Sequence, residues 1–340
     1  MKRPEQPCFG RSTLNLAYRG MTTLILESSQ KALSIAPAHT MDYAGRQILL
    51  FYFEGLSAHE EKLRSAWDEE TLHDMRVATR RLRVACRLLR TTFHPDQLGL
   101  FNNWLRELGE VLGAVRDLDV FILFVDEYSR THGLSAGLEA LRASVETNRE
   151  GARATLNQYL GDEPHRRFKT EFIDWLHGEV AQAAPPRKAG QRLVQEVAPI
   201  LLSKGRATTC ASRSSVAEQP APEALHNLRI ACKRFRYTAE FFKSCYGKRL
   251  TGLIHQVTEF QDSLGRYQDA HVHITYLNSF ITRLDRRSSR QRRVQADLEQ
   301  VVSSERLLQR TAYEQFIASW PEDDHPFSSI DFTLKPLSRD

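Results

Sequence analysis

The sequence is poor in the features that mark secreted, membrane and disulfide-stabilised proteins. Its five cysteines, at positions 8, 86, 210, 232 and 245, form neither a CxxC pair nor a metal-ligand spacing. No apolar run approaches the roughly 20 residues that a membrane-spanning helix needs. The N-terminus also lacks the continuous apolar stretch of a signal peptide. We therefore expect a cytoplasmic protein with reduced cysteines and no membrane partner.

Signatures of common catalytic centres are also missing. The chain contains no G-x-S-x-G elbow, no P-loop, no H-E-x-x-H pair and no cluster of acids suited to magnesium. We expect no catalytic residues, no cofactor, no metal and no enzymatic activity. The net charge of +5 comes from 47 basic and 42 acidic residues, so the distribution of charge along the chain has to be examined instead.

Helical periodicity dominates the chain, and no stretch alternates as a strand does, so we predict an all-α fold. Met41 directly precedes the first convincing helix and is a second candidate start codon. Proline, glycine and serine clusters divide the rest. We expect a poorly ordered leader over residues 1–40, a helical bundle over 41–183, a linker over 184–222 with a short helix near 190–202 and a flexible loop over 204–222, a second bundle over 223–320, and a tail over 321–340.

Two motifs occur twice in the same order. Residues 72–78 (LHDMRVA) match 225–231 (LHNLRIA) at an offset of 153, and residues 80–83 (RRLR) fall on 233–236 (KRFR). Residues 112–120 then match 264–272 at an offset of 152. Two motifs at nearly one spacing indicate an internal duplication.

The first copy places six cationic or potentially cationic side chains on one side of a predicted helix. Their spacing of 3, 4, 3, 4 and 3 residues keeps them on one face over about 25 Å. Apolar residues at 75, 78, 82, 85 and 89 occupy the opposite face. The cationic positions are His73, Arg76, Arg80, Arg83, Arg87 and Arg90.

The second copy repeats this design with His226, Arg229, Lys233 and Arg236, and then weakens because Glu240 takes the place equivalent to Arg87. Like charges at helical spacing cost about 0.2–0.5 kcal/mol per pair, so the run is self-destabilising unless an anion answers it. A single basic run is usually a solvated helix face. Two copies at matching positions, each headed by histidine, favour binding of a polyanion instead.

Arginine suits such a ligand because its planar fork donates paired hydrogen bonds to phosphate oxygens. The histidines would strengthen binding when protonated at mildly acid pH. Arg81 and Arg234 lie off the stripe, and we expect them to make structural ion pairs or helix-end contacts.

Residues 73–83 and 112–120, with their second copies at 226–236 and 264–270, resemble the CHAD domain, the histidine-containing α-helical domain. The resemblance covers about residues 40–320. It implies two antiparallel four-helix bundles related by a pseudo-twofold axis, with a basic groove between them that binds inorganic polyphosphate. Some family members associate with polyphosphate granules. The implied ligand set is His73, Arg76, Arg80, Arg83, His226, Arg229, Lys233 and Arg236, extended by Arg87 and Arg90.

The second motif has less certain roles. Arg116 is expected to form a further basic wall of the groove and Asp117 to orient a motif arginine, whereas the alternative is a pair of interhelical bridges. Gln268 replaces the arginine in the second copy, which puts a symmetric role in doubt. Gly113 and Gly265 are expected to allow close helix approach.

Three rival functions stay open. The first is an enzyme. CHAD domains can be fused to, or encoded near, triphosphate tunnel hydrolases, which carry an ExExK motif near their start, and residues 60–62 (EEK) have the wrong spacing for that motif. Nucleic acid is a weaker candidate partner, because the stripe has few interleaved aromatics and no helix-turn-helix or zinc-finger signature. An acidic protein could also occupy the groove, and the sequence is compatible with a homodimer.

Overall fold

The computed structural model describes residues 33–177, 187–216, 221–285, 287–320, 327 and 330–334. Residues Ile35–Asp340 form one compact unit, and of the separate unit Met1–Ser34 only residues 33–34 are described. In the described ranges regular structure is helical throughout, which confirms the all-α prediction. The helices are α2 (Met41–Ser65), α3 (Glu69–Leu88), α4 (Pro95–His132), α5 (Ala136–Gly161), α6 (Glu163–His177), α7 (Lys188–Gln191), α8 (Val194–Ser214), α9 (Pro222–Phe241), α10 (Lys243–Tyr246), α11 (Lys248–Thr282) and α12 (Ser289–Ser319). No described helix is long and apolar enough to cross a membrane.

Helix positions reproduce the sequence repeat. The first residues of α2, α3, α4 and α5 (41, 69, 95 and 136) lie 153 positions before the first residues of α8, α9, α11 and α12 (194, 222, 248 and 289). Helices α3 and α9 are both 20 residues long. This common spacing is what an internal duplication predicts.

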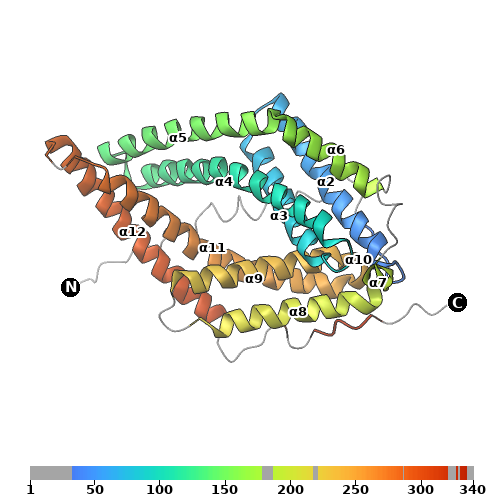
Figure 1. Ribbon diagram of the computed structural model, residues 1–340. Coiled ribbons are helices and arrows are strands. Elements are labelled where there is room, and N and C mark those ends of the chain that lie inside the picture. The colour runs from blue at the N-terminus through green and yellow to red at the C-terminus, as the bar shows by residue number, and fades with distance from the viewer. Residues whose placement is uncertain are drawn as a thin grey trace. The chain divides into compact units, whose positions relative to one another are not determined.

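In each half, helices that follow one another along the chain pack side by side: α2 to α5 in the first half, and α8, α9, α11 and α12 in the second. The halves meet where α3 contacts α9 and where α5 contacts α12 (Figure 1). Apolar residues of α4, α5, α11 and α12 share one core around Val125, Leu141, Leu277 and Leu298. This common core fixes the two halves against each other, and with them α3 and α9.

Local sequence explains why α3 forms as it does. Asp68 caps its first turn, because the Asp68 carboxylate accepts a hydrogen bond of 2.7 Å from the backbone N–H of Thr71. The predicted apolar face is buried at positions 75, 78, 82, 85 and 89. In α9 the corresponding Leu228, Ala231 and Phe235 are buried as well. Burial of the apolar faces turns both cationic faces toward the boundary between the halves.

The flexible loop predicted over residues 204–222 is wrong for residues 204–214, which continue α8. The serine and threonine hydroxyls that suggested a loop donate to backbone carbonyls one turn earlier, as Thr209 does to Gly205 (2.9 Å). Gly205 allows Phe235 of α9 to pack closely, since a Cβ there would lie 2.8 Å from the Phe235 ring. Tertiary packing therefore overrides the local preference, and α8 belongs to the second half rather than to a linker.

The leader and tail predictions fall largely outside the described residues, but their described parts are packed. Ile35 is buried, and its N–H donates to Ser244 Oγ (2.9 Å). Residues 35–40 are therefore not the poorly ordered segment that we expected. In the tail, Phe327 is buried and its carbonyl accepts a hydrogen bond of 3.1 Å from Arg206 of α8.

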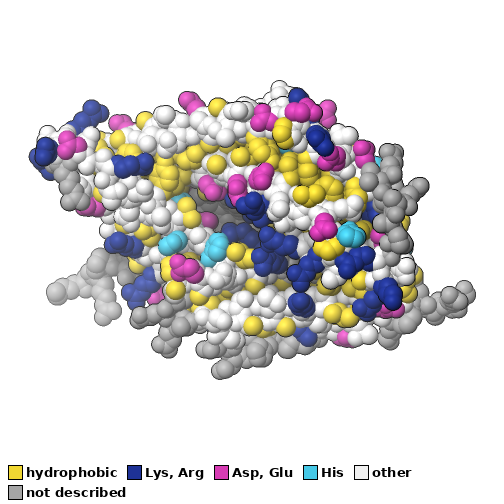
Figure 2. Space-filling model, viewed as in Figure 1, with side chains coloured by type: hydrophobic (Ala, Val, Ile, Leu, Met, Phe, Trp, Pro, Cys, Tyr) yellow, Lys and Arg dark blue, Asp and Glu magenta, His cyan; other side chains and the backbone are white. Residues whose placement is uncertain are grey.

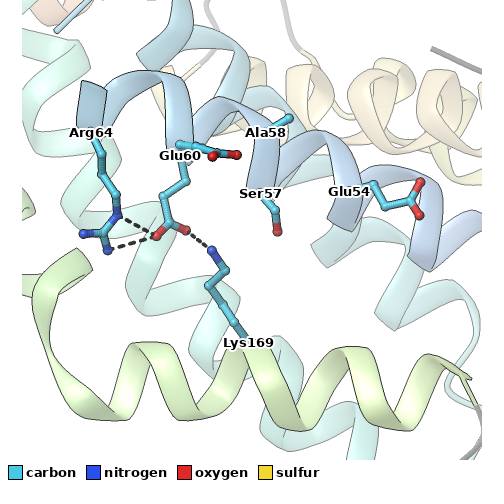
Figure 3. A pocket seen from close by; sticks show the side chains of 7 residues that line it. Glu54, Ser57, Ala58, Glu60, Arg64 and Lys169 are labelled. Carbon is cyan, nitrogen blue, oxygen red and sulfur yellow. Dashed lines mark hydrogen bonds and ion pairs between the residues drawn. The ribbon is translucent and has the colours of Figure 1, made fainter. Parts of the chain in front are cut away.

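A buried carboxylate joins α2 to α6. Glu60 is 2 % exposed and accepts hydrogen bonds from Arg64 (3.0 Å), Lys169 (2.9 Å) and His165 (3.1 Å). It lies at the edge of an open pocket of about 520 Å³, and Figure 3 shows Arg64 and Lys169 converging on it. Burial alone would raise the pKa of Glu60, but the hydrogen bonds and charges of His165 and Lys169 outweigh it and hold the pKa at about 2.

We expect Glu60→Gln to lower the free energy of unfolding by ~3 kcal/mol, because it removes the buried carboxylate whose contacts with His165 and Lys169 lower its pKa on folding. Since the pKa of Glu60 falls from 4.5 to about 2 on folding, its stabilisation should be complete above pH 4.5 and lost as pH falls toward 2. Urea unfolding at several pH values measures this. Glu61→Gln, at an exposed neighbouring site, is the matched control. Equal stabilities of the two variants would contradict the assignment.

Candidate functional site

The cationic faces of α3 and α9 lie against each other. Arg76 and Arg80 of α3 are close enough for their charges to act on Arg229 and Lys233 of α9. Figure 2 shows lysine and arginine side chains gathered in the middle of this face, beside a hollow between the two halves. We call the set central to both stripes the cationic groove. Its members are Arg76, Arg80, Arg83, Arg229, Lys233 and Arg236.

Few carboxylates neutralise this groove. Arg76 lies 3.4 Å from Asp117, and Arg236 lies 3.3 Å from Glu240. The other four members have no ion pair within 4.0 Å among the residues that the structure describes. The Nε–H groups of Arg80, Arg83 and Arg229 are also buried without a described acceptor. Buried guanidinium donors without acceptors are costly, so this arrangement favours an anionic ligand that supplies oxygen atoms.

Arginines outside the groove provide the contrast. Arg149 and Arg153 of α5 lie 3.6 and 3.3 Å from Asp119, a fully buried carboxylate, and Arg153 lies 3.7 Å from Glu69. Arg142 contacts two further acids. The Nε–H groups of Arg149 and Arg153 are likewise buried without a described acceptor, so what distinguishes the groove is its scarcity of described carboxylates and not its unpaired Nε–H groups.

Burial and the concentrated positive charge lower the pKa of cationic groups in the groove. Burial, followed by the charges of Arg229, Arg80, Arg76 and Arg236, lowers the pKa of Lys233 to about 6. Above pH 6 an increasing fraction of Lys233 is therefore neutral in the free protein. A bound anion would restore the ammonium form.

His73 is affected in the same direction. Burial, then the charges of Arg116, Arg80 and Arg76, lower its pKa to about 3. The prediction that His73 becomes protonated at mildly acid pH is therefore wrong for the free protein. Neutral His73 can still donate one hydrogen bond to an anion. Among the groove residues, Lys233 is the one whose pKa is brought to about 6.

We expect Lys233→Met to raise the free energy of unfolding by about 1–4 kcal/mol while weakening anion binding, because it removes a desolvated cation from among arginines. A purely structural role for Lys233 would produce the opposite change in stability. Thermal and urea unfolding measure the first effect. Lys204→Met, at an exposed position of α8, is the control and should change stability by less than about 0.5 kcal/mol.

The second motif lies on α4 beneath the groove. Arg116 is buried and near enough to His73 for their charges to interact, and no described carboxylate forms an ion pair with it. This position fits a basic wall better than an interhelical bridge. Asp117 contacts Arg76, as predicted. Close helix packing at the motif glycines is not observed: a Cβ at Gly113 would lie 3.6 Å from the Arg76 guanidinium, and at Gly265 it would meet nothing within 4 Å.

The second copy of this motif has its own acid. Asp269, the counterpart of Asp117, lies near Arg229 and Lys233. Although its side chain is accessible to water, the protein atoms crowded around it raise its pKa despite these cations.

The residues at the ends of the two predicted stripes are more exposed than those at the centres. Helix α3 ends at Leu88, so Arg90 lies beyond it, exposed, and the prediction that the stripe continues on this helix is wrong there. Arg87 is exposed in the last turn. His226 is exposed in the first turn of α9, and no hydrogen bond or ion pair to another described residue holds it. The structure thus brings the middle residues of the α3 stripe close to the middle residues of the α9 stripe.

Sequence reasoning missed Arg234. It was expected to make a structural contact like Arg81, which does pair with Glu240 at 2.9 Å. Arg234 instead is exposed and has no described carboxylate partner, and its charge acts on Arg83. Only the folded structure shows the difference: Glu240 pairs with Arg81, whereas Arg87, the counterpart of Glu240, lies near Arg234.

The side-chain chemistry suits binding of anions. No group of three or more histidine, cysteine or acidic side chains in the described ranges has the geometry to hold a metal ion. The groove offers guanidinium and ammonium donors along two helices, and the imidazole of His73 lies close to Arg76 and Arg80. Such a set can contact many oxygen atoms of an extended anion at once.

Comparison with known proteins agrees with this architecture. The sequence profile of the CHAD domain matches residues 47–278. The Mycobacterium tuberculosis protein named Uncharacterized protein Rv2226 is 27 % identical over 192 residues, which are 50 % of this chain and 34 % of that protein. The chain therefore spans about a third of that curated relative.

Two solved structures share the fold. The crystal structure of the CHAD domain from the plant Ricinus communis has a TM-score of 0.62 and 24 % identity, covering 86 % of this chain and 92 % of that one. PptA from Streptomyces chartreusis has a TM-score of 0.61 and 15 % identity, covering 81 % of this chain and 99 % of that one.

Proposed function

The chain belongs to the CHAD domain family, and we propose that it binds inorganic polyphosphate along the cationic groove between α3 and α9. The observation that supports this most is the unpaired state of Arg80, Arg83, Arg229 and Lys233, for which the described residues provide no carboxylate within 4.0 Å. A linear phosphate polymer supplies closely spaced oxygen anions to both helices together. Its binding would offset the mutual repulsion of the cations.

Binding by this mechanism is electrostatic capture. The apolar faces of α3 and α9 are buried behind the groove, so its charges act partly through protein rather than through water, which strengthens them. Arginine donors such as those of Arg80 and Arg229 stay charged at every physiological pH. Affinity should therefore rise with the number of phosphates that the two rows can contact.

The test is calorimetric titration of the purified chain with long-chain polyphosphate at several salt concentrations. Six groove cations should release counterions much as phosphate contacts do in nucleic-acid complexes. We therefore expect affinity to fall by ~10³-fold between about 50 and 200 mM salt. An excess of duplex DNA should displace the polymer poorly. Binding that is insensitive to salt, or equally strong for DNA, would refute the proposal.

We also propose that the chain binds this polymer without processing it. The groove holds donors and charges, and its one poised histidine, His73, has a pKa of about 3, far below that of an effective general base at neutral pH. Incubation of the protein with polyphosphate and magnesium, followed by gel electrophoresis, should leave the chain-length distribution unchanged. Shortened or lengthened chains would show an enzyme.

A protein with this property would gather on polyphosphate granules in the cytoplasm. Fluorescent tagging of the full chain tests this. The signal should coincide with granules and disperse when groove cations are reversed. Persistent localisation of the reversed variant would show that another surface directs the protein.

A further inference from the structure

The two ends of the cationic groove are not equivalent. Positions 81 and 87 of α3 correspond to positions 234 and 240 of α9 at the offset of 153. A pseudo-twofold exchange of the helices therefore converts the pair 81–240 into the pair 234–87. In a symmetric protein both pairs would carry the same charges, but here they do not.

One end is closed by an ion pair. Arg81 of α3 donates to Glu240 of α9 at 2.9 Å, and its guanidinium lies 5.6 and 5.4 Å from the ring centres of Tyr52 and Tyr237. Glu240 also lies 3.3 Å from Arg236. One carboxylate therefore partly neutralises two arginines at this end, and the side chains are largely enclosed.

The other end carries arginine on both helices. Arg87 and Arg234 are exposed, and burial and the charge of Arg87 lower the pKa of Arg234. Arg83 lies beside both, with its Nε–H buried and unpaired. The acid whose charge acts on Arg83 is Glu110, and Glu110 itself forms an ion pair of 3.5 Å with Arg106. Three arginines thus meet where the symmetry-related position has a neutralised pair.

We infer that Arg87 and Arg234, next to Arg83 of the groove, form a second anion subsite at one end of the groove, which holds phosphates of a chain already bound at the centre. This inference rests on the proposed function and adds a direction and a length preference to it. The bound polymer would extend from the centre past Arg87 and Arg234, and not past the closed Arg81–Glu240 end.

Geometry makes this subsite selective for longer chains. Arg87 lies seven residues beyond Arg80 on α3, which is about 10 Å along the helix axis. A single phosphate or diphosphate at the centre cannot span this distance. Only a chain with further phosphate units gains contacts with the subsite.

The experiment compares wild type with the double variant Arg87→Ala and Arg234→Ala, titrated with tripolyphosphate and with long-chain polyphosphate. Two charge-assisted contacts are lost, so we expect ~10²-fold weaker binding of the long chain and less than a ~threefold change for tripolyphosphate. Arg290→Ala with Arg293→Ala, at exposed positions of α12, is the control of equal charge and should leave both affinities unchanged.

The single variant Arg234→Glu provides an independent check of folding. A glutamate there would face Arg87 as Glu240 faces Arg81, so the variant should be at least as stable as wild type while losing the length preference. If wild type binds neither ligand, the proposed function itself fails. If wild type binds but Arg87→Ala with Arg234→Ala loses nothing, or loses equally for both ligands, the subsite does not exist.

Discussion

The double variant Arg80→Glu with Lys233→Glu should lose polyphosphate binding while retaining its helical content. Both residues lie at the centre of the groove, and neither is paired with a described carboxylate. Each contributes a charge-assisted contact of about 1.5–3 kcal/mol. The loss of both contacts and the repulsion between the new glutamates and the phosphates should lower the affinity by at least ~10²–10⁴-fold. Calorimetry measures the loss, and circular dichroism reports the helicity.

Folding should survive this exchange because the new glutamates lie among cations. Arg76, Arg229 and Arg236 remain nearby, so the substitutions replace repulsion with attraction. The matched control is Arg290→Glu with Arg293→Glu, which changes net charge equally at exposed sites on α12. Unchanged affinity of the groove variant, or equal loss in the control, would show that overall charge and not this site binds the polymer.

Affinity for long-chain polyphosphate should fall as pH rises above 6, by up to about tenfold per pH unit. Lys233 has a pKa of about 6 in the free protein. A bound anion stabilises the ammonium and raises this pKa, so binding above pH 6 takes up a proton. Below pH 6 Lys233 is already charged, and the affinity should level off. Calorimetry at successive pH values measures the slope.

Variants separate the contribution of Lys233 from other titrating groups. Lys233→Arg keeps the charge at every pH and should remove most of the slope, while any titration of the ligand persists. Asp269 of α11 lies near Lys233 and also has a raised pKa, so Asp269→Asn tests whether Asp269 contributes to the pH dependence. His73 stays neutral throughout this range. A slope that survives Lys233→Arg unchanged would contradict the role of Lys233.

The fold could be predicted to the extent that it depends on repeated patterns. Heptad-like spacing identified the buried faces of α3 and α9, and the repeat offset of 153 recurs in the helix starts. The extension of α8 through residue 214 could not be seen, because its serines and threonines favour loops locally. Packing of Phe235 against Gly205 and burial of Arg213 determine the helix there.

For the site, sequence reasoning identified the middle of each stripe and failed where tertiary contacts decide. Helical spacing alone cannot reveal that α3 stops before Arg90. Nor can it show that Arg81 meets Glu240 while Arg234 meets Arg87, since both pairings cross the boundary between the halves. The low pKa values of His73 and Lys233 also arise from burial and from the charges that folding brings together.

A structure of the chain with bound polyphosphate would test the central claim most directly. We expect continuous density for the polymer between α3 and α9, with phosphate oxygens within hydrogen-bond distance of Arg80, Arg229 and Lys233. Polymer density confined to another basic surface, such as residues 290–293 of α12, with the groove side chains unmoved, would contradict it.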